Sequence, residues 1–304
     1  MKTAKIPNRN GLGITLAAVL HTPDGFDESN SYPAVVVSHP GGGVKEQTAG
    51  LYASKLAESG LLAIAFDRSY QGESTGEPRQ LENPYVSAED VSAVIDYLTT
   101  LPYVDADRIG AMGICAGAGY TANAAINDRR IKAVATVSAV NIGSMFRNGW
   151  DNDIPSKNAI PVLEGGSQAR TLEASGADAV TMPLAPLKRE DAPNEELAQA
   201  WEYYHTPRCM VSSAPGYAMA RSLNQIVTYD AYSMADVFLT QPLQVIAGSV
   251  AGSKWMSDDL FERAASQDKS FHVVDGANHM QLYDVPEYVN EAAAVLTSFF
   301  ASKL

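Results

Sequence analysis

The feature that most constrains the fold is a regular alternation of short apolar runs with amphipathic segments along most of the chain. Such alternation is typical of a largely parallel, twisted β-sheet flanked by helices, the α/β class. Runs rich in β-branched or apolar residues and bounded by Gly, Pro or Asp predict the strands. They cover residues 13–20, 33–38, 61–66, 108–114, 132–139, 242–248 and 270–274.

Amphipathic segments between these runs predict helices. Ser87 is expected to cap one whose apolar residues share a face, and Gly60 is expected to end another over residues 45–59. A third is expected to begin at Ser257, and a closing helix to cover residues 286–301.

The alternation lapses over residues 141–241, where aromatic, Met and Pro residues gather. Long structureless loops are rare in compact domains. This stretch therefore predicts an inserted helical cap over a site, with a separate structural subdomain as the alternative. Residues 1–140 and 242–304 would form the α/β core.

Composition bears on the partners of the protein. The net charge is −13, and no Lys/Arg-rich run is present, so we do not expect nucleic acid as a partner. The longest apolar runs, such as residues 61–66, fall far short of the roughly 20 residues of a membrane helix. We therefore expect no membrane partner, and the sequence leaves open whether the chain forms a homodimer.

The chain ends and the cysteine count bear on localisation. The first residues lack the apolar core of a secretory signal, and two cysteines are too few for a disulfide framework, so we expect a soluble intracellular protein. The last residues, Ser302, Lys303 and Leu304, match a peroxisomal address. In a eukaryotic protein this would indicate the peroxisomal matrix. In a bacterial protein the match would be a coincidence and the location cytoplasmic.

The sharpest chemical motif is G-x-C-x-G at residues 113–117, which follows an apolar strand and opens a helix rich in small residues. A nucleophile on a strand-to-helix turn needs small neighbours two residues away on each side, and glycine supplies both. The Cys115 thiol would lie at a helix N-terminus, where the dipole favours thiolate, so we expect its pKa to fall below about 8.5. The alternative is a buried structural cysteine.

A second pattern overlaps the first. Residues 117–122 also fit the dinucleotide fingerprint G-x-G-x-x-A, but that fold needs an acidic residue near the end of the next strand, which here reads TVSAVN. We therefore expect no nucleotide cofactor, and no metal site is predicted.

A base and an oxyanion site complete the prediction. Of five histidines, His279 is best placed because it follows the last predicted strand, in the order nucleophile then late histidine. The turn with Gly41 and Gly42 follows an earlier strand, and its backbone N–H groups, with that of Ala116, would hold a developing oxyanion. A plain glycine turn is the alternative.

At this point the sequence resembles the α/β-hydrolases, and within them the dienelactone-hydrolase-like branch with a cysteine elbow. The segments HPGGGVKEQT, AFDRSYQGESTGEPR, MGICAGAGY and DGANHMQLYD, with the spacing between them, are similar to the YcjY-like group and to fungal polyketide transferases and thiohydrolases. The resemblance covers nearly the whole chain. It implies the fold, the nucleophile Cys115, the base His279 and an oxyanion loop around Gly41.

One part of the family pattern is missing. The turn at residues 248–253, where the acid that orients the histidine normally lies, has no carboxylate. Asp258, Asp259 and Asp67 are the candidate acids, and Asp67 is expected to be structural. A dyad of cysteine and histidine is preferred, because a thiol needs less help to ionise than a hydroxyl.

The sequence thus predicts a hydrolase of activated carboxylic esters or thioesters that forms an acyl-enzyme on its cysteine and needs no cofactor. An acyltransferase or cyclase acting on a polyketide-like or acyl-CoA substrate is one alternative, and a non-catalytic binding protein is another. The partner is then a small-molecule acyl ester or thioester. Candidate substrate-binding aromatic residues are Tyr70, Trp150, Tyr204 and Trp255.

Overall fold

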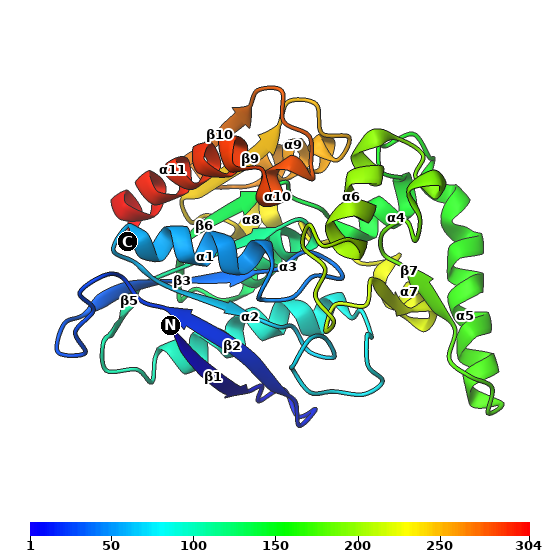
Figure 1. Ribbon diagram of the computed structural model, residues 1–304, viewed down its shortest axis with the longest axis horizontal. Coiled ribbons are helices and arrows are strands. Elements are labelled where there is room, and N and C mark those ends of the chain that lie inside the picture. Colours follow the sequence, from blue (N-terminus) through cyan, green and yellow to red (C-terminus); the bar gives the residue numbers. More distant parts are fainter.

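An eight-stranded sheet forms the centre of the molecule in the computed structural model, which describes all 304 residues (Figure 1). The strand order is β1-β2-β4-β3-β5-β6-β9-β10. β1 and β2 are antiparallel to their neighbours, and every pair from β4 onward is parallel. The strands are β1 (Lys2–Pro7), β2 (Thr15–His21), β3 (Tyr32–Ser38), β4 (Leu62–Phe66), β5 (Val104–Ile114), β6 (Ile131–Val137), β9 (Leu243–Gly248) and β10 (Lys269–Val274). The α/β-hydrolase fold expected from the sequence is confirmed.

All seven predicted strands are present in this sheet, and β1 is the one strand of the sheet that was not predicted. In β1 only Ile6 is buried, because the strand lies at the edge of the sheet and pairs with β2 alone. Its sequence, KTAKIP, also lacks the apolar run that marks the other strands, because lysines interrupt its apolar residues.

Helices cover both faces of the sheet. α2 (Pro84–Leu98), α3 (Ala116–Asn127) and α9 (Lys254–Arg263) contribute to one apolar cluster, and α1 (Thr48–Glu58), α10 (Gln281–Asp284) and α11 (Pro286–Lys303) to the other. Successive residues of β3 alternate between the two clusters, Val36 in the first and Val37 in the second. The strand is therefore apolar on both faces, as a sandwiched parallel sheet requires.

Two predicted helix starts were wrong. α2 begins at a proline, and Asn83 caps it by accepting hydrogen bonds from two backbone N–H groups. Ser87 lies inside that helix and accepts from the Arg68 guanidinium at 2.9 Å. Ser253 precedes α9, and Ser257 lies inside it, where its hydroxyl accepts from a backbone N–H that follows β6. Both serines satisfy buried donors of other segments, which a local pattern does not reveal.

The segment between β6 and β9 lies beyond one end of the sheet, with α5 outermost (Figure 1). It holds α4 (Ile142–Asn148), η1 (Ser156–Ala159), α5 (Ile160–Ala174), β7 (Thr181–Pro183), η2 (Arg189–Asp191), α6 (Glu195–His205), β8 (Tyr217–Met219), η3 (Ala220–Ser222), α7 (Leu223–Ile226) and α8 (Ala235–Phe238). β7 and β8 form a small antiparallel ribbon, so the segment is not purely helical. Its last part packs into the main core through Ile226, Tyr232 and Leu239.

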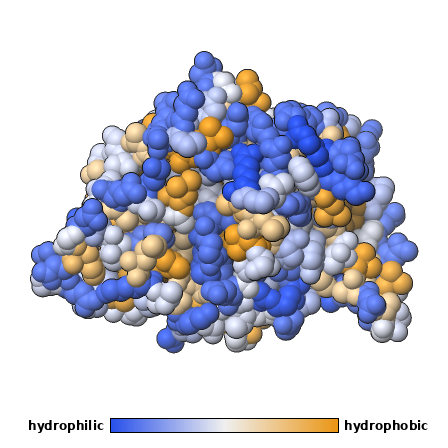
Figure 2. Space-filling view, viewed as in Figure 1, coloured by the Kyte–Doolittle hydropathy of each residue, from blue (hydrophilic) through white to orange (hydrophobic).

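Three further features bear on partners and localisation. Figure 2 shows a mostly hydrophilic face on which apolar residues are scattered in small groups. No helix is long and apolar enough to cross a membrane. The C-terminal tripeptide belongs to the end of α11, where Lys303 forms an ion pair with Asp268 and Leu304 packs against the core.

Candidate active site

Cys115 lies on the sharp turn that joins β5 to α3. Its backbone has φ 56° and ψ −125°, a conformation that costs a residue with a side chain about 1–3 kcal/mol. A Cβ on Gly113 would lie 2.2 Å from the carbonyl oxygen of Gly117, and one on Gly117 would lie 2.4 Å from that of His39. Close backbone approach therefore requires both glycines, for the reason predicted from the motif.

The thiol faces a small apolar cavity of about 70 Å³. Twelve of its fourteen lining residues are hydrophobic, and half of the fourteen come from residues 141–241. The lining consists of Gly41, Cys115, Ala116, Val140, Ile142, Met145, Trp150, Leu184, Leu197, Ala200, Tyr204, His279, Met280 and Tyr283. The fold thus brings Cys115 and His279 to one cavity, with the inserted segment as its cover.

Two backbone N–H groups point at the sulfur. The N–H groups of Gly41 and Ala116 donate to Cys115 and work to lower its pKa. Gly42 is not among the groups at the thiol, and a Cβ on it would lie 3.1 Å from the side chain of Leu184. Of the three predicted oxyanion donors, Gly41 and Ala116 converge on the sulfur of Cys115.

The thiol is not pre-ionised. Burial raises the pKa of Cys115, and the hydrogen bonds that Tyr283, Ala116 and Gly41 donate to its thiolate form offset only part of that effect. The predicted lowering of its pKa was therefore wrong in direction. A helix N-terminus contributes at most about 2 kcal/mol, whereas removing a thiolate from water costs more. At neutral pH the thiol keeps its proton and needs a base.

His279 lies in the loop between β10 and α10 and is 1% exposed. Burial lowers its pKa to about 3, so the imidazole is neutral at pH 7 and able to accept a proton. Its Nδ1 lies 2.6 Å from the hydroxyl of Ser253, and its Nε2 lies 3.1 Å from the hydroxyl of Tyr283. The Trp150 ring packs edge-on at 4.8 Å between centroids.

Tyr283 lies between His279 and Cys115. Its hydroxyl hydrogen-bonds both Nε2 of His279 and the thiol of Cys115. We did not single out this tyrosine in the sequence. It follows the histidine by four residues, and that spacing within one helical turn is the signal that could have found it.

The three candidate acids lie away from His279. Asp258 and Asp259 form ion pairs within α9, and Asp67 is fully buried beneath the oxyanion loop. Ser253, the last residue of the turn that lacks a carboxylate, takes the place at Nδ1. A neutral hydroxyl therefore stands where the family pattern has an acid.

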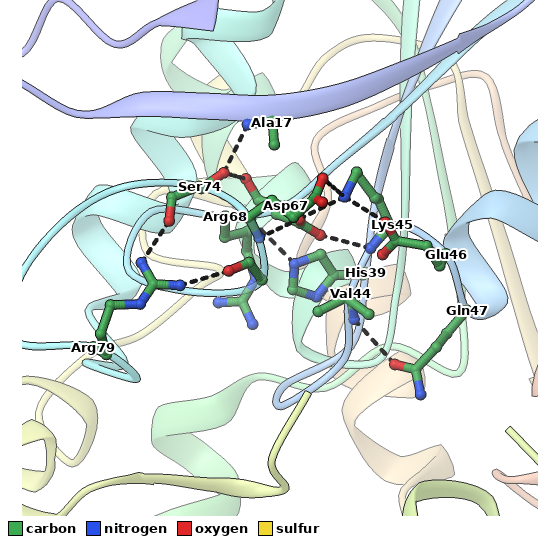
Figure 3. A network of polar contacts seen from close by, with 12 residues as sticks. Ala17, His39, Val44, Lys45, Glu46, Gln47, Asp67, Arg68, Ser74 and Arg79 are labelled. Atoms are coloured by element: carbon green, nitrogen blue, oxygen red, sulfur yellow. Dashed lines mark hydrogen bonds and ion pairs between the residues drawn. The ribbon is translucent and has the colours of Figure 1, made fainter. Parts of the chain in front are cut away.

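The structural role expected for Asp67 is visible in Figure 3. Its carboxylate accepts from the backbone N–H of Lys45 and of Glu73, each at 2.8 Å, and from the Lys45 ammonium at 2.9 Å. In the same view, the ring of His39 accepts from the backbone N–H of Arg68 at 3.2 Å. These bonds brace the loop that carries Gly41.

The same network contains the one group of side chains with the spacing of metal ligands. The carboxylates of Glu46, Asp67 and Glu73 have oxygens within 4.8 Å of one another. The ammonium of Lys45 bonds all three carboxylates, so it fills the place that a cation would take.

A carboxylate of the inserted segment holds the loops of the site together. Glu196, on α6, accepts from the backbone N–H of His279 at 2.6 Å and from that of Gly252 at 3.1 Å. It also accepts from the indole of Trp150 at 2.6 Å. No motif marks this residue in the sequence.

The predicted aromatic residues divide into two groups. Trp150 and Tyr204 line the cavity. Tyr70 instead belongs to the main core at 7% exposure, and Trp255 donates from its indole to the carbonyl oxygen of Trp150 at 2.8 Å. Neither of these two lines the cavity.

Comparison with known proteins identifies the family. The family model for the Dienelactone hydrolase family matches residues 16–152. The chain is 68% identical to the protein YcjY of Escherichia coli K12, over 98% of this chain and 97% of that protein. A thiohydrolase of Eupenicillium brefeldianum is 24% identical over 95% of this chain and 90% of that protein.

A solved structure agrees with this assignment. The crystal structure of a hypothetical protein from Pseudomonas aeruginosa superposes with a TM-score of 0.89 at 30% identity, covering 100% of this chain and 93% of that one. With the strand order and the strained turn at Cys115, these likenesses place the chain in the dienelactone hydrolase family of α/β-hydrolases.

Proposed function

We propose that this protein hydrolyses activated esters or thioesters through an acyl-enzyme formed on Cys115. One observation carries the proposal: a cysteine on a strained turn shares an apolar cavity with a neutral histidine, and two backbone N–H groups converge on its sulfur. Family membership supports ester or thioester chemistry, and the thiohydrolase relative supports the thioester in particular.

The proton path follows from the hydrogen bonds. The Nδ1–H of His279 donates to the Ser253 hydroxyl, which leaves Nε2 as the acceptor that faces Tyr283. As the thiol proton passes to the oxygen of Tyr283, the phenolic proton passes to Nε2. The sulfur is then a thiolate, the imidazole an imidazolium, and the phenol is restored.

The bond-making steps use the same groups. The sulfur attacks the acyl carbon, and the N–H groups of Gly41 and Ala116 stabilise the oxyanion, a contribution of about 10²–10³-fold for each donor. The proton on His279 returns along the same path to the leaving alkoxide or thiolate. Water, deprotonated by His279, then attacks the thioester, and the carboxylic acid and free thiol are released.

Ser253 in place of an acid fits a thiol nucleophile. A hydroxyl orients the imidazole but does not stabilise the imidazolium as a carboxylate does. A thiol ionises more readily than a serine hydroxyl, so the pair needs less of that stabilisation.

The test is the intact mass of the protein after brief exposure to p-nitrophenyl esters and acyl-CoA thioesters. An acyl adduct is expected on the wild type and on Cys209→Ala, and none on Cys115→Ala. Cys209 is the matched control, because it is also a partly buried free cysteine but lies outside the cavity.

The outcomes separate the alternatives. Decay of the adduct in water supports a hydrolase, whereas decay only with an added amine or alcohol indicates an acyltransferase. Equal adducts on the wild type and Cys115→Ala would refute the nucleophile, and no adduct or turnover with any substrate would favour a binding protein.

A further inference from the structure

The cavity around Cys115 is small, apolar and without charge, and these properties limit the acyl group it accepts. Resting on the function proposed above, we infer that the protein is selective for short, uncharged acyl groups of about two to three carbons. Neither the family assignment nor the fold specifies such a limit.

The size argument rests on the volume of about 70 Å³. A dry protein cavity of about 150 Å³ holds one benzene molecule, which has six carbons. In proportion, the space beside the thiol holds about three carbons, an acetyl or propionyl group. The leaving group must then lie outside this space.

The residues that line the cavity are held in place, so the cavity keeps this volume. Met145 on α4 and Leu197 on α6 enter from the inserted segment. The hydrogen bonds that Glu196 accepts from the backbone N–H groups of His279 and Gly252 hold that segment against the core. A longer chain would have to separate elements that buried, charge-assisted bonds join.

The charge argument rests on the lining. None of the fourteen residues is Lys, Arg, Asp or Glu, and burial keeps His279 neutral. The nearby guanidinium of Arg68 is fully buried and already paired with Glu82. An acyl group that carries its own carboxylate would be desolvated there without a partner, which is costly.

The experiment compares acyl groups on one leaving group. We would measure kcat/KM and the rate of Cys115 acylation with p-nitrophenyl acetate, propionate, butyrate and hexanoate, and with the hemisuccinate ester. The acetate or propionate is expected to be fastest. Each methylene beyond the fit should cost about 10- to 200-fold, and the hemisuccinate at least 100-fold against the butyrate of equal chain length.

A matched pair of variants tests the wall. Met145→Ala removes a side chain that lines the cavity, and Met210→Ala makes the same change at a position that is 59% exposed. Met145→Ala is expected to raise kcat/KM for the butyrate or hexanoate ester, relative to that for the acetate ester, by at least tenfold. The second should leave the profile unchanged. Leu197→Ala provides a second enlargement should the first variant not fold.

The results distinguish the two proposals. Faster acylation of Cys115 by hexanoate or hemisuccinate than by acetate would overturn the chain-length and charge limit but leave the nucleophile intact. An optimum that neither enlargement moves would overturn the assignment of the wall. Absence of any adduct with every ester would overturn the proposed function, and this inference with it.

Discussion

Acidification is expected to destabilise this protein through His279. The imidazole is buried and its pKa is lowered to about 3, whereas an unfolded chain leaves the pKa near 6.5. Below pH 6.5 the unfolded state therefore binds a proton that the folded state does not, and stability falls with pH. Above pH 6.5 this loss of stability vanishes. Below pH 6.5 the free energy of unfolding falls by about 1.4 kcal/mol for each pH unit, down to about pH 3. From pH 8 to pH 5 the loss is about 2 kcal/mol.

The assay is urea unfolding at pH 8 and pH 5 for the wild type and His279→Gln. Other titrating groups are common to both proteins, so the difference between them isolates His279. The free energy of unfolding of the wild type should fall by about 2 kcal/mol more than that of the variant. His272 lies outside the cavity, where it makes an exposed hydrogen bond to Glu291, and His272→Gln should follow the wild type. If the wild type and His279→Gln fall in parallel, the histidine is not buried as a neutral base and the reasoning fails.

Three further changes test the site. Tyr283→Phe should lower kcat about 100-fold and convert a curved proton inventory in mixed light and heavy water to a linear one, while Tyr85→Phe at the surface should do neither. Unchanged kcat would exclude the relay. Glu196→Gln turns one carboxylate oxygen, an acceptor, into an amide donor that faces N–H groups. Urea unfolding should therefore show a free energy of unfolding lower by about 2–3 kcal/mol, and an unchanged free energy would refute the role of Glu196 in holding the loops together. Gly117→Ala should lower the melting temperature sharply because its Cβ meets backbone at 2.4 Å, whereas Gly165→Ala, which has open space on α5, should not; equal melting temperatures would contradict the steric argument.

Local sequence patterns predicted the strands of the sheet and the turn at Cys115 well. Strand periodicity identified the central strands because they are sandwiched and apolar on both faces. The G-x-C-x-G motif predicted the turn at Cys115, since the crowding of Gly113 against the backbone of Gly117 acts within five residues of chain. The crowding at Gly117 itself comes from the carbonyl oxygen of His39, which only the folded sheet brings near. The edge strand β1 escaped because only Ile6 is buried in it.

The partners of the site were not predictable in this way. Ser253 and His279 lie after different strands, β9 and β10, which pair only in the folded sheet. Glu196 is 83 residues from His279, and no short pattern joins them. A search for a carboxylate near the histidine therefore selected Asp258 and Asp259, which instead pair within their own helix.

The sequence by itself determined the α/β-hydrolase architecture, the strained turn that presents Cys115 and the order of nucleophile and histidine, because these depend on local periodicity and on glycine at fixed spacing. Only the tertiary structure decided the protonation of the site. The sequence places Cys115 at a helix N-terminus, which favours thiolate, but the inserted segment covers it and removes water. Desolvation depends on everything that packs around a group, so it raises the pKa of the thiol and lowers that of His279 in a way that no local pattern encodes.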